Sequence, residues 1–221
     1  GPGAGAGWLA ADSVFVCGGA IQTPALLLNS GIGVNVGNSL AMHPTIKVVA
    51  RFADPVNSAN MGVGTHQAKG AAGAAGAAGT TSYGCSISSP AHLALALLDH
   101  PSALAELRPG WRNMAVYYAA ARGAGTGSVR RVPGFRDPLV RYRVGADDLD
   151  ELTRGLKTLC ELLFAAGAVR LYPAVAGLGP FSEPGELRGL PERLSPETLR
   201  LITIHLFGST PMGEKRSLCA A

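Results

Sequence analysis

A histidine near the end of the sequence is the residue best suited to acid–base chemistry. His205 lies at the end of an apolar run and is followed by Gly208, Ser209, Met212 and Gly213. A histidine side chain accepts and releases a proton near neutral pH, so His205 is a candidate general base. A histidine in an apolar run is also often a hydrogen-bonded core residue, and at this point both interpretations stay open.

The other histidines suggest no further catalytic or metal chemistry. His43 precedes Pro44 at a turn into a strand and could serve either role, whereas His66, His92 and His100 are expected in loops or at helix edges. The sequence has no HExxH pair and no Cys/His cluster, so we expect no metal site. It also has neither the GxSxG turn of hydrolases nor the GxxxxGK[ST] loop that binds phosphates.

The elements that must position such a base begin with the stretch 14–33. Residues 14–17 are apolar and partly β-branched, which predicts a buried strand. Gly18 and Gly19 follow, and a glycine pair allows both a tight turn and the close approach of another group to the backbone.

A short helix is expected directly after this turn. Thr23 and Pro24 are typical of an N-cap and a first helical position, and Gly31 is typical of a helix end. The helix start would then present free N–H groups beside the glycine turn. Such a place suits a phosphate, a carboxylate or the polar edge of a cofactor.

The composition is that of a globular protein. The 221 residues are 47% hydrophobic and 15% charged, with a net charge of +4, and can form one large domain or two small ones. The basic residues are scattered without interleaved aromatics, so we expect no nucleic-acid partner. No apolar run is long enough for a membrane span. Four widely spaced cysteines predict free thiols and a cytoplasmic location.

The remaining pattern predicts an α+β fold. Strands are expected at residues 46–52, 82–89, 139–144, 169–172 and 199–206, and helices at residues 91–99, 101–107 and 146–166. Residues 114–119 and 128–132 are expected to pair as a hairpin, because a glycine-rich turn separates them. The Gly-Ala-Ala repeat at 70–79 is expected to be a low-complexity insertion without chemistry.

Three blocks of the sequence, in order, resemble the glucose–methanol–choline (GMC) oxidoreductases, a family of FAD-dependent enzymes. The first block matches the family's second signature at small, Thr-Pro, aliphatic and Ser-Gly positions: Gly19, Ala20, Thr23, Pro24, Leu26, Leu27, Ser30, Gly31, Ile32 and Gly33. In the second block, a GxxL segment at 37–40 runs into His43 and Pro44. The third block, 205–213, resembles the H-x-x-G-[ST]-x-x-M-G segment that carries the family's active-site histidine.

The resemblance implies an enzyme that oxidises an alcohol with FAD as its cofactor. In that family an active-site histidine takes the hydroxyl proton while a hydride passes from carbon to the flavin. His205 matches the position of that base. Gly18, Gly19 and Ala20 fall where the family's backbone passes close to FAD. The resemblance also implies a largely antiparallel substrate domain with helices.

The resemblance further implies a partial chain, because the family's N-terminal GxGxxG fingerprint and its final segment have no counterpart here. We expect residues 1–42 to be a remnant of the FAD-binding domain, residues 43–198 to be the substrate-binding domain, and residues 199–221 to be a truncated return to the FAD domain. A missing N-terminal FAD-binding segment is the expected partner, and the isolated chain is expected to be inactive. The alternative is a non-catalytic fragment or interaction module that keeps the substrate-domain fold without flavin.

Overall fold

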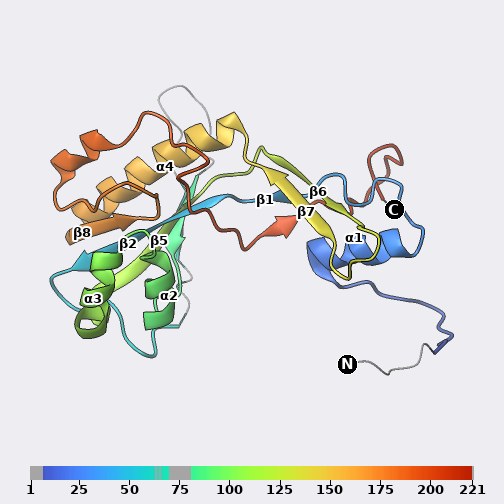
Figure 1. The fold of residues 1–221 in the computed structure, drawn as a ribbon, viewed down its shortest axis with the longest axis horizontal. Coiled ribbons are helices and arrows are strands. Elements are labelled where there is room, and N and C mark those ends of the chain that lie inside the picture. Colours follow the sequence, from blue (N-terminus) through green and yellow to red (C-terminus); the bar gives the residue numbers. More distant parts are fainter. Residues whose placement is uncertain (1–6, 63, 65, 70–80, 221) are drawn as a thin grey trace.

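A five-stranded antiparallel sheet forms the larger part of the molecule, as seen in a computed structural model that describes residues 7–62, 64, 66–69 and 81–220. Its strands are β3 (Gln67–Lys69), β4 (Ser82–Cys85), β5 (Met114–Ala120), β2 (Thr45–Phe52) and β8 (Ala168–Pro173), in that spatial order. Helices cover both faces, as Figure 1 shows, and the α+β prediction is confirmed. The Gly-Ala-Ala repeat lies outside the described residues.

The long helix α4 (Ala146–Ala165) covers one face of this sheet. Its leucines form one apolar stripe, as the sequence predicts, and pack on the alternate β2 residues Ile46, Val48 and Ala50. The buried Asp148 carboxylate accepts hydrogen bonds from the backbone N–H groups of Gly145, Ala124 and Gly125. This side chain therefore caps the helix and also fixes the loop that follows β5.

Two short helices, α2 (Pro90–Ala96) and α3 (Pro101–Gly110), cover the opposite face. A 3-10 turn at Trp111–Asn113 leads from α3 into β5. Leu93 and Leu97 are fully buried there against residues of β2 and β5 that include Val49 and Met114. β2, which lies between β5 and β8, therefore contributes alternate residues to both cores.

The other end of the molecule is built from small elements. They are α1 (Gly19–Asn29), the hairpin of β6 (Thr126–Arg130) with β7 (Leu139–Arg143), and the pair of β1 (Ala41–Met42) with β9 (Leu206–Phe207). Figure 1 shows this end set apart from the larger sheet, with β1 leading directly toward β2.

The predicted strand at 14–17 is wrong. These residues are extended but unpaired, and Val14 and Phe15 are 80% and 88% exposed. A strand is defined by a hydrogen-bonded neighbour, and among the described residues none lies alongside this segment. The β-branched composition of residues 14–17 is therefore not sufficient to make them a strand.

The helix after the glycine pair is present but begins earlier than predicted. α1 starts at Gly19, directly after Gly18, and Pro24 lies inside the helix instead of at its first position. Gly31 has a φ of +79°, so the predicted left-handed residue after the helix is confirmed.

Two strand pairings also differ from expectation. The segment 114–119 does not pair with 128–132, because β5 is already bonded to β2 on one edge and to β4 on the other. β6 pairs with β7 instead. The expected strand at 199–206 is reduced to isolated bridges at Leu199 and Ile202, followed by the short β9.

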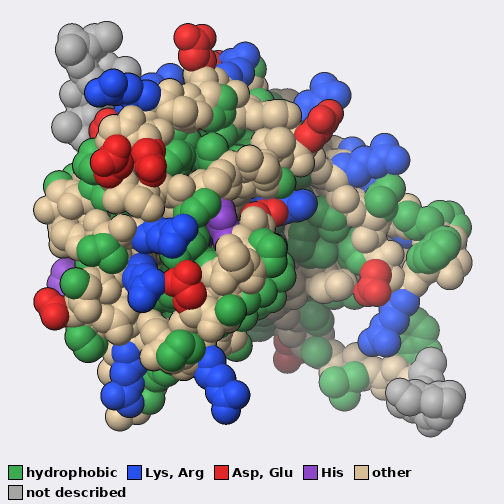
Figure 2. Space-filling view, turned by 60° about the vertical axis from the view of Figure 1, so that its left-hand side comes forward, with side chains coloured by type: hydrophobic (Ala, Val, Ile, Leu, Met, Phe, Trp, Pro, Cys, Tyr) green, Lys and Arg blue, Asp and Glu red, His purple; other side chains and the backbone are tan. Residues whose placement is uncertain are grey.

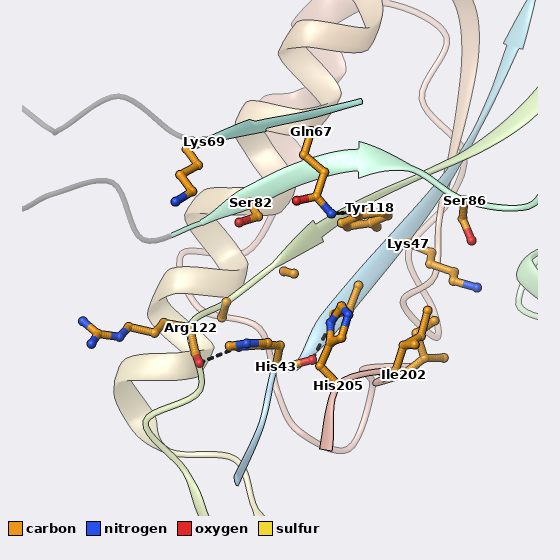
Figure 3. Close-up of a pocket in the computed structure, with 14 residues that line it drawn as sticks. His43, Lys47, Gln67, Lys69, Ser82, Ser86, Tyr118, Arg122, Ile202 and His205 are labelled. Carbon is orange, nitrogen blue, oxygen red and sulfur yellow. Dashed lines mark hydrogen bonds between the residues drawn. The ribbon is translucent and has the colours of Figure 1, made fainter. Parts of the chain in front are cut away.

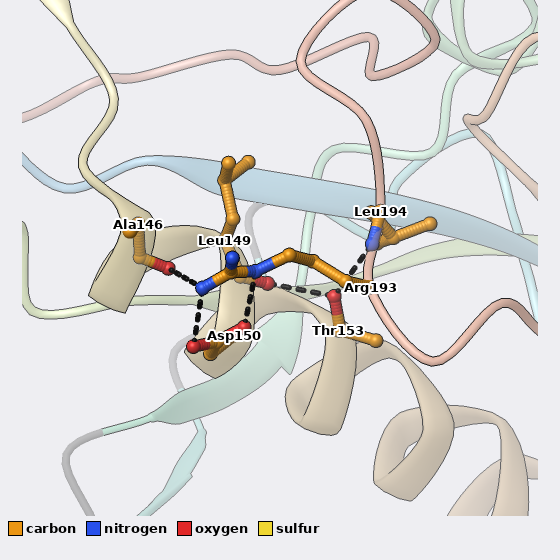
Figure 4. A network of polar contacts seen from close by, with 6 residues as sticks. All are labelled: Ala146, Leu149, Asp150, Thr153, Arg193 and Leu194. Atoms are coloured by element: carbon orange, nitrogen blue, oxygen red, sulfur yellow. Dashed lines mark hydrogen bonds and ion pairs between the residues drawn. The ribbon is translucent and has the colours of Figure 1, made fainter.

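A polar network joins α4 to the loop that contains Arg193 and Leu194 (Figure 4). The Arg193 guanidinium donates to both carboxylate oxygens of Asp150 at 2.6 Å. The N–H of Leu194 donates to the hydroxyl of Thr153, which in turn donates to the Leu149 carbonyl. The same loop follows a 3-10 turn at Pro184–Gly189, and it closes over the apolar stripe of α4.

The surface mixes charges of both signs, and the four cysteines are free. Figure 2 shows lysine, arginine, aspartate and glutamate side chains interspersed over the face that it presents. Among the helices of the described residues, none has both the length and the hydrophobicity that crossing a bilayer requires.

A buried and an exposed leucine of α4 give a matched test of this core. Leu152 is fully buried against the sheet, whereas Leu162 is half exposed. We expect Leu152→Ala to lower the free energy of unfolding by about 2–5 kcal/mol. Leu162→Ala should lower it by less than about 1 kcal/mol. Urea unfolding followed by circular dichroism measures both, and equal losses would contradict the described packing.

Thiol labelling tests the burial of Cys160. Burial raises the pKa of the Cys160 thiol to about 12, so its reactive thiolate is scarce at pH 8. Cys17 is exposed. We expect iodoacetamide at pH 8 to modify Cys17 in the native protein and Cys160 only after unfolding, as read by peptide mass spectrometry. Rapid native labelling of Cys160 would show that α4 is not packed as described.

Candidate functional site

The candidate site is formed where two segments distant in sequence pair. β1 and β9 are antiparallel, with Ala41 opposite Phe207 and Met42 opposite Leu206. The pairing continues on both sides: Thr45 and Ile202 exchange two backbone hydrogen bonds of 3.0 Å, and the Ser39 hydroxyl donates to the Gly208 carbonyl at 2.6 Å. These bonds fix the segment that carries His205.

Glycine is required at position 208. Its φ is +76°, and a Cβ atom at this position would lie 2.6 Å from the Ser39 carbonyl oxygen. Only a residue without a side chain allows the two segments to approach this closely. The glycine that follows His205 in the third sequence block thus has a structural cause.

His43 and His205 are brought together by this pairing. Their ring centroids are 5.8 Å apart with the planes at 72°, and His43 also contacts the Phe207 ring. Nδ1 of His43 lies 2.7 Å from the Arg122 carbonyl oxygen. Because a carbonyl only accepts, Nδ1 must carry a hydrogen, and in the neutral ring Nε2 is left as an acceptor.

His205 is not a core histidine. It is exposed, and its ring has no hydrogen bond to another residue that the structure describes. The histidine that fills the structural role is His100, expected in a loop or at a helix edge. It is 5% exposed, and its Nε2 lies 2.7 Å from the Pro173 carbonyl oxygen.

The two histidines form one wall of a cavity of about 530 Å³ (Figure 3). The sheet supplies its floor through two cross-strand rows. One row runs across β3, β4, β5 and β2, and consists of Gln67, Gly84, Tyr118 and Lys47. The next row consists of Lys69, Ser82, Ala120 and Thr45.

Tyr118 lies flat on this floor. A Cβ atom on Gly84 would be 2.6 Å from the Tyr118 hydroxyl oxygen, so the ring occupies the space above the glycine. The Gln67 amide donates to that hydroxyl at 2.8 Å. Because Gly84 has no side chain, the Tyr118 ring can lie down on the sheet and leave the space above it to the cavity.

A second cavity, of about 570 Å³, lies at the start of α1. Gly19 and Ala20 line it together with Phe207 and Gly208, whereas Gly18 lies beside it as the helix N-cap. The structure thus brings two of the three predicted cofactor-binding residues to the segment that carries His205, but into a different cavity.

Ser209 connects the first turn of α1 to the segment that follows His205. Pro24 has no N–H, so the Ala20 carbonyl lacks its usual donor four residues along α1. The Ser209 hydroxyl donates to that carbonyl at 2.6 Å, and Ser209 is only 2% exposed. Ala20 of the first block and Ser209 of the third are thereby joined by one hydrogen bond, which the missing N–H of Pro24 makes possible.

Comparison with known proteins shows the family of the chain. A family model described as GMC oxidoreductase matches residues 6–45. An uncharacterized GMC-type oxidoreductase of Sinorhizobium fredii is 36% identical over 95% of this chain, and one of Mycobacterium tuberculosis is 30% identical over 95%. The chain belongs to the GMC oxidoreductase family.

This GMC chain spans 41% and 33% of the length of those two relatives. A more distant relative, described as a long-chain-alcohol oxidase of Arabidopsis thaliana, is 25% identical over 73% of this chain and 21% of its own length.

Sequence reasoning did not identify the sheet residues of the GMC chain's cavity. Lys47 and Tyr118 lie on predicted strands, but only the register of β2 against β5 places them opposite each other. Within the part of the chain that the structure describes, no three His, Cys, Asp or Glu side chains are grouped to hold a metal ion.

A double-mutant cycle tests the link between Ser209 and Pro24. Ser209→Ala removes the only donor assigned above to the Ala20 carbonyl, and we expect it to lower the opening free energy of α1 by about 1 kcal/mol. In a Pro24→Ala background the restored N–H can bond to that carbonyl, so the same change should cost much less. Amide hydrogen exchange of α1 measures both. Equal costs in the two backgrounds would contradict the proposed link.

Proposed function

We propose that this chain forms the substrate-facing and proton-accepting part of an FAD-dependent oxidoreductase that acts on alcohols. The observation that carries the proposal is the exposed imidazole of His205 in a cavity whose wall it shares with His43. Membership of the GMC family supports the oxidoreductase class, and one distant relative is described as an alcohol oxidase.

Oxidation of an alcohol to a carbonyl compound removes a hydride from carbon and a proton from oxygen. Bound FAD supplies the two-electron acceptor for the hydride. The ring of His205 is free to accept the hydroxyl proton, because no described residue holds its nitrogens. His43 presents Nε2 as a second acceptor in the same wall, and the single hydrogen of the hydroxyl can be donated to only one of the two rings.

The first turn of α1 fits the polar edge of such a cofactor. A helix start has backbone N–H groups without partners in the helix, and Gly18, Gly19 and Ala20 occupy this position. Gly19 has a φ of +68° with open space where a Cβ would stand. Apolar side chains, among them Leu27 and Ile32, line the rest of that cavity and suit a flat ring. We propose that these residues hold FAD.

The domain division also stays a proposal, with residues 1–42 and 199–221 assigned to the FAD-binding part and residues 43–198 to the substrate-binding part. β1–β9 pairing supports the association of the first and last segments, since β1 lies within residues 1–42 and β9 within residues 199–221. The cytoplasmic location stays a prediction that rests on cysteine spacing.

Replacement of His205 tests the proposed base. In the flavin-containing enzyme we expect His205→Asn to lower the rate of alcohol oxidation by about 10²–10⁴-fold, because the hydroxyl proton loses its acceptor. The rate is measured with an artificial electron acceptor. His92→Asn is the control, since His92 is exposed on α2, outside the lining of the cavity.

An unchanged oxidation rate in the His205→Asn enzyme would show that His205 is not the base. After incubation with FAD and removal of the unbound cofactor, a protein without flavin absorption would instead favour the non-catalytic interaction module as its function.

A further inference from the structure

The cavity that holds His205 is positively charged on its sheet side. Three basic residues, Lys47, Lys69 and Arg122, line it, whereas none of its described lining residues is an aspartate or glutamate. In Figure 3 the Arg122 side chain points away from the two histidines, with only its carbonyl oxygen facing His43. The other two charges of the lining are the lysines, and in Figure 3 the Lys47 side chain extends toward Ser86 and Ile202, at the end of the lining away from the two histidines.

Lys47 is the more constrained of the two lysines. It is half-buried on the interior strand β2, whereas Lys69 is exposed on the edge strand β3. Burial lowers the pKa of Lys47, and no carboxylate contributes to this shift. The ammonium thus has less water around it without having gained a counter-charge from the described residues.

Arg51 is a cation on the same face of β2 that does have a carboxylate partner. It lies four residues further along β2, on the side that Lys47 and Val49 share, and it forms an ion pair with Glu106 of α3. Lys47 has no such partner in the described part of the chain. Its neighbours in the cavity lining are Tyr118, directly opposite on β5, and the Ser86 and Ile202 side chains seen around it in Figure 3.

A half-buried ammonium without a counter-charge in a ligand-sized cavity is suited to bind an anion. We infer that the alcohols taken by this site carry a carboxylate, which Lys47 binds while the hydroxyl group faces His205. A single ammonium matches the single negative charge of a carboxylate. The Ser86 hydroxyl is placed in the same lining and can donate to the second carboxylate oxygen. The substrate class is then hydroxy acids.

This inference rests on the proposed function for the hydroxyl end of the ligand, but its carboxylate end can be tested without turnover. The probes are hexanoate and 1-hexanol, which share a chain length and differ in charge. Isothermal titration of the full chain gives the ratio of the two affinities. We expect Lys47→Gln to lower the ratio of hexanoate to hexanol affinity by about tenfold, because one charge-assisted hydrogen bond is lost.

Two further variants separate charge from fold. Lys47→Arg keeps the positive charge and should keep most of the preference for hexanoate. Lys157→Gln removes an exposed lysine of α4 that is absent from the cavity lining, and should leave the ratio unchanged. Equal ratios for the native protein and Lys47→Gln, or no preference for hexanoate in the native protein, would overturn the inference.

Turnover then separates the two proposals. The flavin-containing enzyme should oxidise 6-hydroxyhexanoate with a higher kcat/KM than 1,6-hexanediol. Oxidation of both at equal kcat/KM would overturn the hydroxy-acid class and leave His205 as the base. Hexanoate binding that depends on Lys47, in an enzyme that oxidises no alcohol, would confirm the anion site and refute the proposed reaction.

Discussion

The pairing of residues 37–45 with residues 202–209 is the constraint on which the candidate site depends. It joins segments more than 150 positions apart through the β1–β9 pair, the Thr45–Ile202 bridge and the bonds at Gly37 and Ser39. β2 continues directly from this pairing into the large sheet, where it lies between β5 and β8. The same strand therefore sets the position of the histidine wall and the position of the cavity floor.

The cavity combines two surfaces of different character. The wall holds the rings of His43 and His205, of which His43 also contacts Phe207, and the floor carries polar side chains of the sheet. Antiparallel pairing places every second residue of each strand on this floor. The remaining residues of β2 on the other face, such as Ile46 and Val48, belong to the core below α4. The alternation of side chains along β2 thus places one set of residues in the hydrophobic core and the other set in the cavity floor.

The sequence predicted those parts of the structure that depend on local patterns. The apolar stripe of α4 and the β-branched run of β2 are found as predicted, because periodicity and side-chain shape act within each element. The strand at 14–17 and the hairpin of 114–119 with 128–132 were wrong because pairing depends on which neighbour is available. The same limit explains why Lys47 and Tyr118 were missed. His205 was identified because its neighbours form a recognisable block, in which Gly208 permits close approach and Ser209 bonds to α1.

The hydrogen bond from Ser209 to Ala20 has a consequence for how the two cavities communicate. Opening of the first turn of α1 breaks that bond and removes one of the contacts that hold Ser209, and loosening of the segment 205–209 exposes the Ala20 carbonyl. Ordering of the first turn of α1 and ordering of the segment at Ser209 are therefore coupled through this bond. The coupling free energy is the same in both directions. A ligand that holds the first turn of α1 closed reduces the entropy that a second ligand loses when it binds at His205. Pro24 leaves the Ala20 carbonyl without a donor inside the helix, and this allows the hydrogen bond that links the two sites.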